Sequence, residues 1–394
     1  MLHNGALSEL PKMIDKLGSF ENIVMICDTN TYRVAGSNVE KMGLKLKKSI
    51  ILNADGLHAN ELGVALAEKE LPEGFDLLLA VGSGTVHDIT RYIAYNTGVS
   101  FVSVPTAASV DGYVSTVAAM TWNGVKRTFT AVGPIAMVAD SGIIAKAPAE
   151  LTAAGVGDLL GKYISLTEWK MGNILTGEYY CPEIVKLMSE AVNEVVENIE
   201  SIAAAENEGI EKLMYGLVLS GLAMQMSGNS RPASGAEHHI SHFIEMGVAG
   251  RNDTFHGEKV GVATALVCDR YHELIKLSAC ELGFNQENAV GKDEIERVFS
   301  SLSEEIINEN KVSPLSGITA EKLAKKWDEI CALYSSVPTG DEIRRLIKLC
   351  GGSTTLSDIK LSDELKDTLF RYSPSVRNRL TLMRIATGFK KMQN

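Results

Sequence analysis

The chain has 394 residues, of which 45% are hydrophobic and 22% charged, a composition typical of a globular protein rather than of a disordered one. Because a single hydrophobic core stops growing below this length, we expect two domains. The formal net charge of -11 excludes nucleic acid and anionic membranes as main partners, since both require a basic surface, and it favours a small-molecule ligand.

The sequence also predicts a cytoplasmic location. No apolar run approaches the roughly 20 residues that span a bilayer. The N-terminus lacks the basic and apolar regions of a signal peptide. The six cysteines contain no Cys-x-x-Cys pair, a pattern that fits free thiols in a reducing compartment.

The first 145 or so residues alternate short apolar runs with amphipathic segments. Continuous apolar runs bounded by Gly, Pro or Asp are typical of a parallel sheet buried on both faces. We therefore predict a doubly wound, Rossmann-like α/β domain over residues 1–147 that binds a nucleotide. The predicted strands are Ile23–Cys27, Ser49–Leu52, Leu77–Val81, Phe101–Val104 and Ile135–Val138, and helices are expected at Glu61–Lys69 and His87–Tyr95. Asn123-Gly124 predicts a β-hairpin near the end of this region.

From about Pro148 onward the pattern changes to long segments of helical period, so residues 148–394 are expected to form an all-α domain. A cleft between the sheet domain and the helical domain would be a natural ligand site. The predicted helices are Gly157–Lys170, Ile184–Ala205, Ile210–Met226, His238–Met246, Lys259–Leu277, Lys292–Asn310, Thr319–Leu333, Asp341–Leu349 and Ser375–Lys390.

A glycine-containing turn, Gly82-Ser83-Gly84-Thr85-Val86-His87-Asp88, follows a predicted strand and opens a helix. Such a turn brings backbone N–H groups to a phosphate, so a pyrophosphate could bind there. His87 replaces the third glycine of the dinucleotide-binding pattern, and a tight turn that binds nothing is the alternative. Asp28, at the end of the first strand, could contact ribose hydroxyls or simply cap a turn.

Two further segments carry polar groups. The loop Pro105-Thr106-Ala107-Ala108-Ser109-Val110-Asp111 follows another strand, where hydroxyls and one carboxylate suit ligand contacts or an ordinary capped turn. Asp158 and Lys162 are four residues apart on a predicted helix, so a surface ion pair is the simplest interpretation. A carboxylate among apolar neighbours, however, requires a partner.

Four of the eight histidines lie between Ser230 and Gly261. His238 and His242 share one helix face, and a polar run separates them from His256, so imidazoles of two elements can converge on one ion. The alternative is a solvated, histidine-rich helix end. Together with Asp158, His238 and His256 would form a three-ligand set with an open position, as in catalytic metal sites.

These motifs, in this order, resemble the glycerol-1-phosphate dehydrogenase family, more narrowly its bacterial branch encoded with arabinose-utilisation genes. This family is part of the dehydroquinate synthase-like and iron-containing alcohol dehydrogenase-like superfamily. The resemblance implies a Rossmann-like domain, a helical domain, a cleft that holds NAD(P)H and a divalent metal, and reduction of dihydroxyacetone phosphate to sn-glycerol 1-phosphate. A homo-oligomer, with a homodimer favoured, is also expected.

The resemblance assigns roles position by position. Asp158, His238 and His256 match metal ligands, with His239 a competitor for His238. Asp111 and His242 match catalytic positions, and Asp111, Asp158 and His242 match substrate contacts. The matched cofactor positions are Asp28, Gly82, Gly84, Thr85, Val86, His87, Asp88, Thr106, Ala107, Ala108, Ser109 and Ser115.

Lys162 stands where iron-dependent relatives have a fourth ligand, so the resemblance favours Zn²⁺ or Ni²⁺ over Fe²⁺. Lys162, Arg231 and Lys126 are candidates for binding the substrate phosphate. A glycerol dehydrogenase, a dehydroquinate synthase-like cyclase and a non-catalytic nucleotide-binding regulator are the alternative functions.

Overall fold

The computed structural model describes residues 1–123, 125–250 and 253–390, and for Val125 and Lys126 it describes only the backbone. The chain forms two compact units, one of Met1–Val156 with Asn193–Gln225 and one of Gly157–Val192 with Met226–Asn394. These units differ from the predicted division into 1–147 and 148–394, because residues 148–156 and 193–225 group with the unit that contains the sheet. That division remains a proposal about which parts of the chain carry which function.

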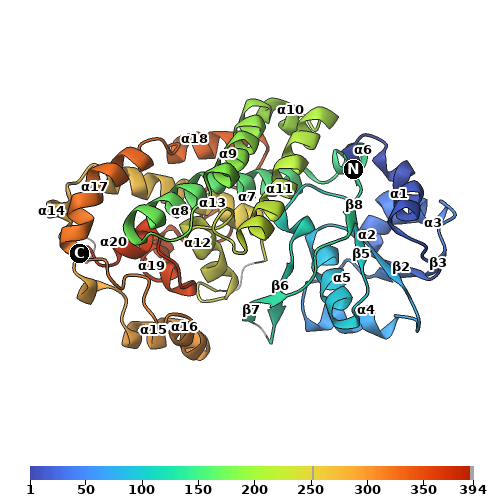
Figure 1. Cartoon of the computed structure of the whole chain (residues 1–394), viewed down its shortest axis with the longest axis horizontal. Coiled ribbons are helices and arrows are strands. Elements are labelled where there is room, and N and C mark those ends of the chain that lie inside the picture. The colour runs from blue at the N-terminus through green and yellow to red at the C-terminus, as the bar shows by residue number, and fades with distance from the viewer. Residues whose placement is uncertain (124, 251–252, 391–394) are drawn as a thin grey trace. The chain divides into compact units, whose positions relative to one another are not determined.

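The first unit is built on a parallel sheet with strand order β3-β2-β4-β5-β8. Figure 1 labels β2, β3, β5 and β8 of this sheet. Its strands are β2 (Ile23–Asp28), β3 (Leu46–Leu52), β4 (Leu77–Gly82), β5 (Phe101–Pro105) and β8 (Ala136–Met137). Every residue of β2, β4 and β5 is buried, as the continuous apolar runs predict. The five predicted strands of the parallel sheet are therefore confirmed.

Apolar side chains cover both faces of this sheet. One hydrophobic cluster joins the strands to α4 (Glu61–Lys69) and α5 (Gly84–Thr97), and a second joins them to α1 (Leu10–Leu17) and the segment around Val39. Two cores on opposite faces of one parallel sheet define a doubly wound α/β architecture.

Smaller β elements complete the first unit. β6 (Val117–Trp122) and β7 (Val125–Thr130) form the predicted antiparallel hairpin, with Asn123 in the left-handed region at φ 52°; Gly124 lies outside the described residues. β1 (Leu2–His3) pairs with β9 (Ala139–Asp140), a ladder too short to leave a pattern in the sequence. The helices α6 (Ser141–Ile144), α10 (Ile199–Ala203) and α11 (Asn207–Ser227) also contribute to this unit.

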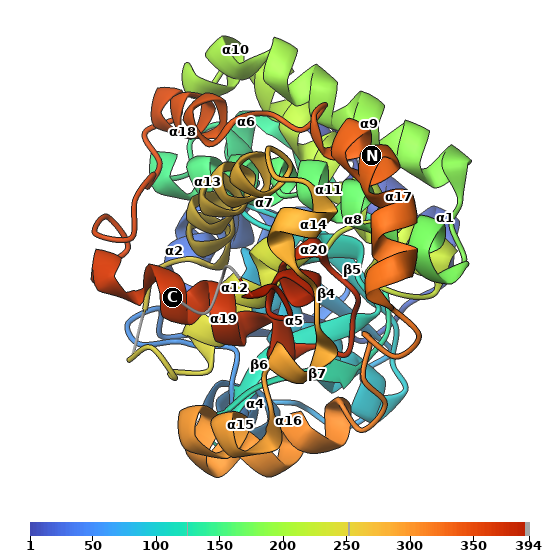
Figure 2. The ribbon, with the colours of Figure 1, turned by 90° about the vertical axis from the view of Figure 1, so that its left-hand side faces the viewer.

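The regular elements described in the second unit are helices, as Figure 2 shows from the side of α17 and α18. They include the end of α7 (Ala149–Leu160), α8 (Lys162–Thr176), the first part of α9 (Pro182–Glu197), α12 (Ala236–Glu245), α13 (His256–Leu274), α14 (Ala279–Leu282), α15 (Lys292–Phe299), α16 (Ser303–Glu309), α17 (Ala320–Tyr334), α18 (Gly340–Leu349), α19 (Lys366–Tyr372), the 3₁₀ turn η7 (Ser373–Val376) and α20 (Leu382–Ala386). The predicted all-α character of this part of the chain is confirmed.

The predicted helix Ser375–Lys390 is wrong over most of its length. Within this range η7 covers Ser375 and Val376, and the α-helical part described is α20, which begins at a Thr381 N-cap whose hydroxyl accepts from Arg384 N at 2.9 Å. Arg377 has extended backbone (φ -135°), which ends η7. Most apolar residues of this segment are buried. Their positions in the sequence therefore reflect burial of the whole segment and not the apolar face of one long helix.

Candidate metal centre and substrate site

Three helices of the second unit bring together the predicted metal ligands. Asp158 lies near the end of α7, His238 in the first turn of α12, and His256 at the start of α13. Gly157 allows α7 and α13 to meet, because a Cβ at this position would lie 2.5 Å from Gly257 O and 3.1 Å from Gly261 Cα. The glycine beside the carboxylate therefore sets how closely Asp158 can approach His256.

The donor atoms of Asp158, His238 and His256 all lie within 4.8 Å of one another. His238 Nε2 is 3.4 Å from Asp158 Oδ1, and the rings of His238 and His256 have centroids 5.4 Å apart. Asp158 is fully buried and His238 is 5% exposed. A carboxylate oxygen and two imidazole nitrogens at such separations form a donor set that fits a divalent cation.

Two glutamates orient the imidazoles of this centre. His238 Nδ1 lies 2.7 Å from Glu237 Oε1, which also accepts from Gly235 N at 2.7 Å. His256 Nδ1 lies 2.7 Å from Glu245 Oε1. When Nδ1 donates to a carboxylate, Nε2 presents its lone pair, the form that a metal requires. The sequence analysis did not predict that these two glutamates orient the imidazoles. Their position in the sequence was the available signal, since Glu237 directly precedes His238 and Glu245 lies three residues after His242.

Lys162 is the direct neighbour of Asp158. Its ammonium is fully buried and donates to Asp158 Oδ1 and to Ala233 O, both at 3.0 Å. The pair is therefore a buried ion pair at the centre, and the interpretation as a surface pair is wrong. Burial opposes ionisation of Asp158, but the Lys162 charge and the hydrogen bond with His238 hold the pKa of Asp158 well below its usual range. Despite burial, the bonds to Asp158 and Glu237 raise the pKa of His238 to about 9.

His242 lies one helical turn after His238, beside the three-residue set. Its ring centroid is 6.1 Å from that of His238 and 5.8 Å from that of His256. The side chain is partly exposed, so a substrate can reach it, and with Glu245 and His256 it forms a second group of converging donor atoms. His239, the alternative to His238 as a predicted metal ligand, is fully buried. It is a member neither of the group of Asp158, His238 and His256 nor of the group of His242, Glu245 and His256.

In the first unit, the glycine-containing turn joins β4 to α5. Ser83 is the N-cap of α5 and makes no side-chain capping bond, so Gly84, Thr85 and Val86 provide the first-turn N–H groups that can meet an anion. The His87 ring is buried, with Nδ1 2.9 Å from Ser83 O and Nε2 2.7 Å from Ser103 Oγ. Burial lowers the pKa of His87 to about 3, so the ring is a neutral internal support of the turn.

The second segment predicted to contact the cofactor runs beside this turn, since Thr106 N donates to Gly82 O at 3.0 Å. Within it, Ser109 Oγ is 3.0 Å from Tyr113 Oη, which donates to Ala107 O at 2.5 Å. These bonds give the loop a fixed shape. Ala108 approaches the backbone of α7, where a Cβ on Gly155 would lie 2.0 Å from Ala108 O. The structure therefore places the Gly82–Asp88 turn and the Thr106–Ser109 loop at one edge of the sheet.

The remaining predicted cofactor and substrate positions make contacts within the protein. Asp88 accepts from the buried Arg91 at 2.7 Å, and Ser115 Oγ lies 3.1 Å from Val117 N. Asp111 opens a short 3₁₀ turn and accepts from Ser220 Oγ of α11 at 2.8 Å. Asp28 caps α2 (Thr29–Thr31), accepting from Asn30 N at 2.8 Å and Thr31 N at 2.9 Å. The capping interpretation of Asp28 is therefore observed, and its ribose contact stays a prediction.

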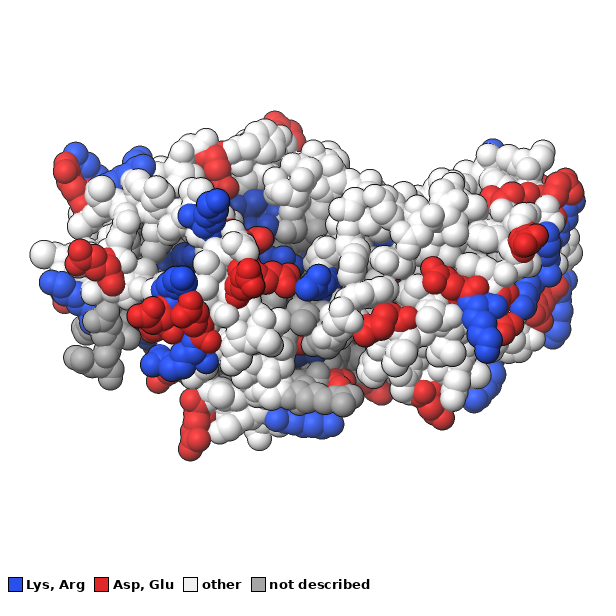
Figure 3. Space-filling model, turned by 90° about the horizontal axis from the view of Figure 1, so that it is seen from below, with Lys and Arg blue, Asp and Glu red and all other residues white. Residues whose placement is uncertain are grey.

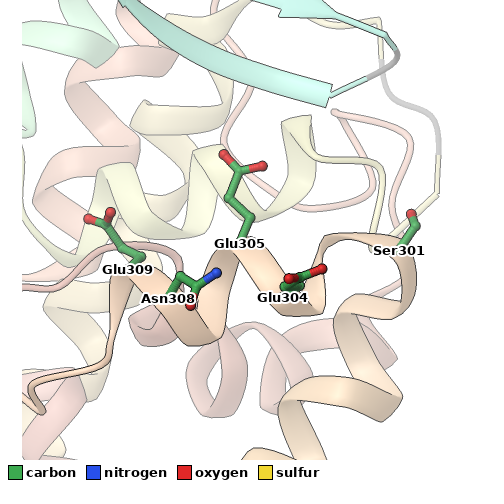
Figure 4. A pocket seen from close by; sticks show the side chains of 5 residues that line it. All are labelled: Ser301, Glu304, Glu305, Asn308 and Glu309. Carbon is green, nitrogen blue, oxygen red and sulfur yellow. The ribbon is translucent and has the colours of Figure 1, made fainter.

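Other surface features differ from this centre in chemistry. A hollow of about 600 Å³ runs along α16 and is lined by Glu304, Glu305 and Glu309 with Ser301 and Asn308, as Figure 4 shows. Its lining carries carboxylates without an imidazole, so it offers neither the metal donors nor the phosphate partners that the resemblance requires. On the face seen in Figure 3, basic and acidic side chains are interspersed. Of the described helices, none is both long enough and apolar enough to cross a bilayer.

Comparison with known proteins agrees with this geometry. A family model described as iron-containing alcohol dehydrogenase matches residues 1–148. The chain is 33% identical to a glycerol-1-phosphate dehydrogenase [NAD(P)+] of Halalkalibacterium halodurans, covering 97% of this chain and 90% of that protein. It is also 33% identical to a protein of the same name from Pyrococcus horikoshii, over 68% of this chain and 76% of that one.

Solved structures share the fold. The structure of an iron-containing alcohol dehydrogenase from Corynebacterium glutamicum superposes with a TM-score of 0.63 at 17% identity, covering 98% of this chain and 92% of that one. This likeness supports the fold. The family follows from the sequence match at 33% identity over 97% of this chain. The chain belongs to the glycerol-1-phosphate dehydrogenase family of oxidoreductases.

Proposed function

We propose that this protein reduces dihydroxyacetone phosphate to sn-glycerol 1-phosphate, reversibly, with NADH or NADPH and one divalent cation. The observation that carries the proposal is the convergence of Asp158, His238 and His256 in a chain of this family. When bound, the cation supplies Lewis-acid polarisation of the ketone, and the reduced dinucleotide supplies the hydride.

The donor set supports Zn²⁺ or Ni²⁺ as the cation. Two imidazoles and one carboxylate are three protein ligands, the number that leaves a catalytic site open for a substrate oxygen. Lys162 bonds to Asp158 and, being a cation, adds no fourth donor. Glu237 and Glu245 hold the two imidazoles with Nε2 available to a metal.

His242 is the residue proposed to handle the proton. It lies beside the donor set and is partly exposed. Burial lowers the pKa of His242 well below its usual value, and the nearby charge of Arg377 adds to this effect, while Glu245 opposes it. The imidazole is therefore neutral, with one N–H donor and one acceptor nitrogen, so it can hold the substrate or relay a proton from solvent rather than store one. Asp111, anchored by Ser220, is proposed to accept a hydrogen bond from a substrate hydroxyl.

The cofactor is proposed to bind at the edge of the parallel sheet. The uncapped first turn of α5 suits its pyrophosphate, because free N–H groups and the helix dipole favour an anion. The Thr106–Ser109 loop, joined to Gly82, and Ser115 would extend this surface toward the nicotinamide. A homodimer and a cytoplasmic location remain predictions.

The test is NADH and NADPH oxidation with dihydroxyacetone phosphate against dihydroxyacetone, before and after Zn²⁺ or Ni²⁺ is added to metal-stripped protein. Turnover that requires the metal and strongly favours the phosphorylated ketone is expected. A preference for the bare ketone would contradict the phosphate-specific assignment and indicate a glycerol dehydrogenase. Absence of turnover with both ketones would contradict the reductase assignment as a whole.

A further inference from the structure

Three buried cations of the chain differ in what they bind. In the second unit, Lys162 donates to Asp158, and Arg231 directs Nε and Nη2 to the carboxylate of Glu178. Both are therefore paired with carboxylates of the protein. In the first unit, Arg91 of α5 is different, because most of its acceptors are backbone carbonyls of another segment. Burial of a guanidinium is costly, so the bonds that compensate for it are informative about its role.

The guanidinium of Arg91 is fully buried and joins α5 to a neighbouring turn of the chain. Nη1 donates to Asp88 Oδ1 at 2.7 Å and to Val117 O at 3.2 Å, and Nη2 donates to Tyr113 O at 3.2 Å and to Gly112 O. Three of these acceptors are main-chain carbonyls of one short segment. A planar guanidinium can serve several acceptors spread in this way, whereas an ammonium is a compact point charge.

Two of the same carbonyls hold Ser115, one of the predicted cofactor positions. Ser115 N donates to Gly112 O at 3.1 Å, and Ser115 Oγ donates to Val117 O at 3.2 Å. Arg91 therefore shares one acceptor with the main-chain N–H of Ser115 and another with its hydroxyl. The position of this hydroxyl depends on carbonyls that Arg91 holds.

Asp111 belongs to the same turn and is also held by α11. Ser220 Oγ donates to Asp111 Oδ2 at 2.8 Å. Gly221 allows α11 to come close, since a Cβ at this position would lie 3.0 Å from Asp111 O. The turn that carries both Asp111 and Ser115 is thus bound by α11 and by Arg91 of α5.

Arg91 lies on the helix whose first turn is the proposed pyrophosphate site. α5 begins at Gly84, and Arg91 follows about two helical turns further along. In the proposed function, the cofactor has its pyrophosphate at this first turn and extends toward Ser115 with its nicotinamide. A single helix therefore holds both surfaces, the first through its N-terminus and the second through Arg91.

Resting on the proposed function, we propose that Arg91 is a positioning residue that sets the turn of Asp111 and Ser115 relative to the first turn of α5. Its guanidinium is fully buried, so it acts through this turn and not by contact with cofactor or substrate. It keeps Ser115 and Asp111 where the nicotinamide and a substrate hydroxyl meet them. Such alignment matters, because a misplacement of about 1 Å can cost about 100-fold in rate.

The experiment compares binding of ADP with binding of NADH. ADP contains the adenosine and the diphosphate but no nicotinamide, so only NADH requires the positioned turn. In Arg91→Met, calorimetric titration is expected to show NADH binding weakened roughly ten- to a hundredfold and ADP binding within about twofold of wild type. Arg91→Lys keeps the charge beside Asp88 and should retain part of the NADH affinity. In metal-loaded Arg91→Met, kcat for dihydroxyacetone phosphate at saturating NADH should fall about 10–100-fold.

Two control variants separate positioning from loss of stability or of charge. Ile93→Ala removes buried apolar atoms from the same helix, and Arg297→Met removes an equal charge from an exposed position of α15. Both should keep the wild-type ratio of NADH affinity to ADP affinity, with thermal denaturation reporting the stability of each variant. Arg91→Lys, which keeps the charge and a buried aliphatic stem, serves as the test if Arg91→Met does not fold.

The two affinities are measured without turnover, which separates this role from the proposed reaction. An unchanged ratio in the folded Arg91 variants, or an equal loss of both affinities, would overturn the positioning role, while wild-type turnover would leave the reductase assignment intact. A lowered ratio in a protein that reduces neither ketone would support the positioning role and overturn the reaction. Binding of neither nucleotide by wild type would overturn both.

Discussion

Glu237 Oε1 lies 2.7 Å from His238 Nδ1 and equally close to Gly235 N, so one buried carboxylate oxygen fixes both the imidazole and the start of α12. Loss of such a partner of a metal-bound histidine commonly weakens metal binding 10–100-fold. We expect that loss for Zn²⁺ in Glu237→Leu and a smaller one in Glu237→Gln, which keeps an acceptor but loses the charge. Competition with a chromophoric chelator measures it. The exposed Glu304→Gln is the control, and wild-type affinity in Glu237→Leu would show that the carboxylate does not support the site.

The contact between α7 and α13 predicts that Gly157 tolerates no larger side chain. In Gly157→Ala the new Cβ would overlap Gly257 O, so the helices must separate, and a stability loss of about 1–3 kcal/mol is expected. Because Asp158 and His256 move apart with the helices, Zn²⁺ affinity should fall as well. Gly291→Ala, where the Cβ meets nothing within 4 Å, is the matched control for urea unfolding and metal titration. If both variants behave alike, close packing at Gly157 does not shape the centre.

Removal of the His242 imidazole should affect catalysis without removing the metal. His242→Ala is expected to lower kcat for dihydroxyacetone phosphate reduction by about 10²–10⁴, the usual contribution of a general acid. Its Zn²⁺ affinity should stay close to that of wild type, because His242 is outside the Asp158 set. Stopped-flow NADH oxidation and metal titration together check this, with the exposed His58→Ala as the control. An unchanged kcat/KM in His242→Ala would remove the residue from the mechanism.

Glu168 predicts a pH dependence of stability. It is fully buried, accepting from Ala236 N at 2.9 Å and Leu382 N at 3.2 Å and from the Tyr271 hydroxyl. Burial, with the nearby charge of Glu237, raises the pKa of Glu168 to about 8 from 4.5. A raised folded-state pKa means that this contribution to stability is complete below pH 4.5 and is lost as the pH rises through about 8.

The measurement for Glu168 is urea unfolding of metal-free protein between pH 5.5 and 8.5. Wild type should lose stability relative to Glu168→Gln as the pH rises, by up to a few kcal/mol, about 1.4 kcal/mol for each pKa unit. Metal-free protein is used because competition between protons and the metal for the histidines would add a second pH dependence to the measured stability. Parallel curves for the two proteins would show that Glu168 does not titrate in this range.

The sequence alone predicted the parallel sheet because β2, β4 and β5 are buried on both faces and therefore read as unbroken apolar runs. It predicted the convergence of Asp158, His238 and His256 through residue type and family resemblance, whereas spacing alone left His239 as a competitor. It could not predict that Lys162 is buried against Asp158, because a spacing of four on a helix is the same for exposed and buried pairs.

The helix prediction for Ser375–Lys390 is wrong because tertiary packing overrides the local pattern there. The segment from Ser375 has helix-like apolar spacing, yet Arg379 and Arg384 bind carbonyls and side chains of distant segments and hold it open. Residues 193–225 group with the unit that contains the sheet, and long-range contacts such as Ser141 Oγ to Glu211 Oε1 at 2.6 Å contribute to this grouping; the predicted division into 1–147 and 148–394 stays a prediction. Such long-range hydrogen bonds cannot be predicted from the pattern of a single sequence.

The most direct test of the central claim is the position of the metal in crystals of Zn²⁺-loaded protein, located by anomalous scattering at the zinc edge. The account predicts one peak about 2.0–2.2 Å from Nε2 of His238, Nε2 of His256 and a carboxylate oxygen of Asp158. A peak held instead by His242, Glu245 and His256, the neighbouring donor group, would contradict it.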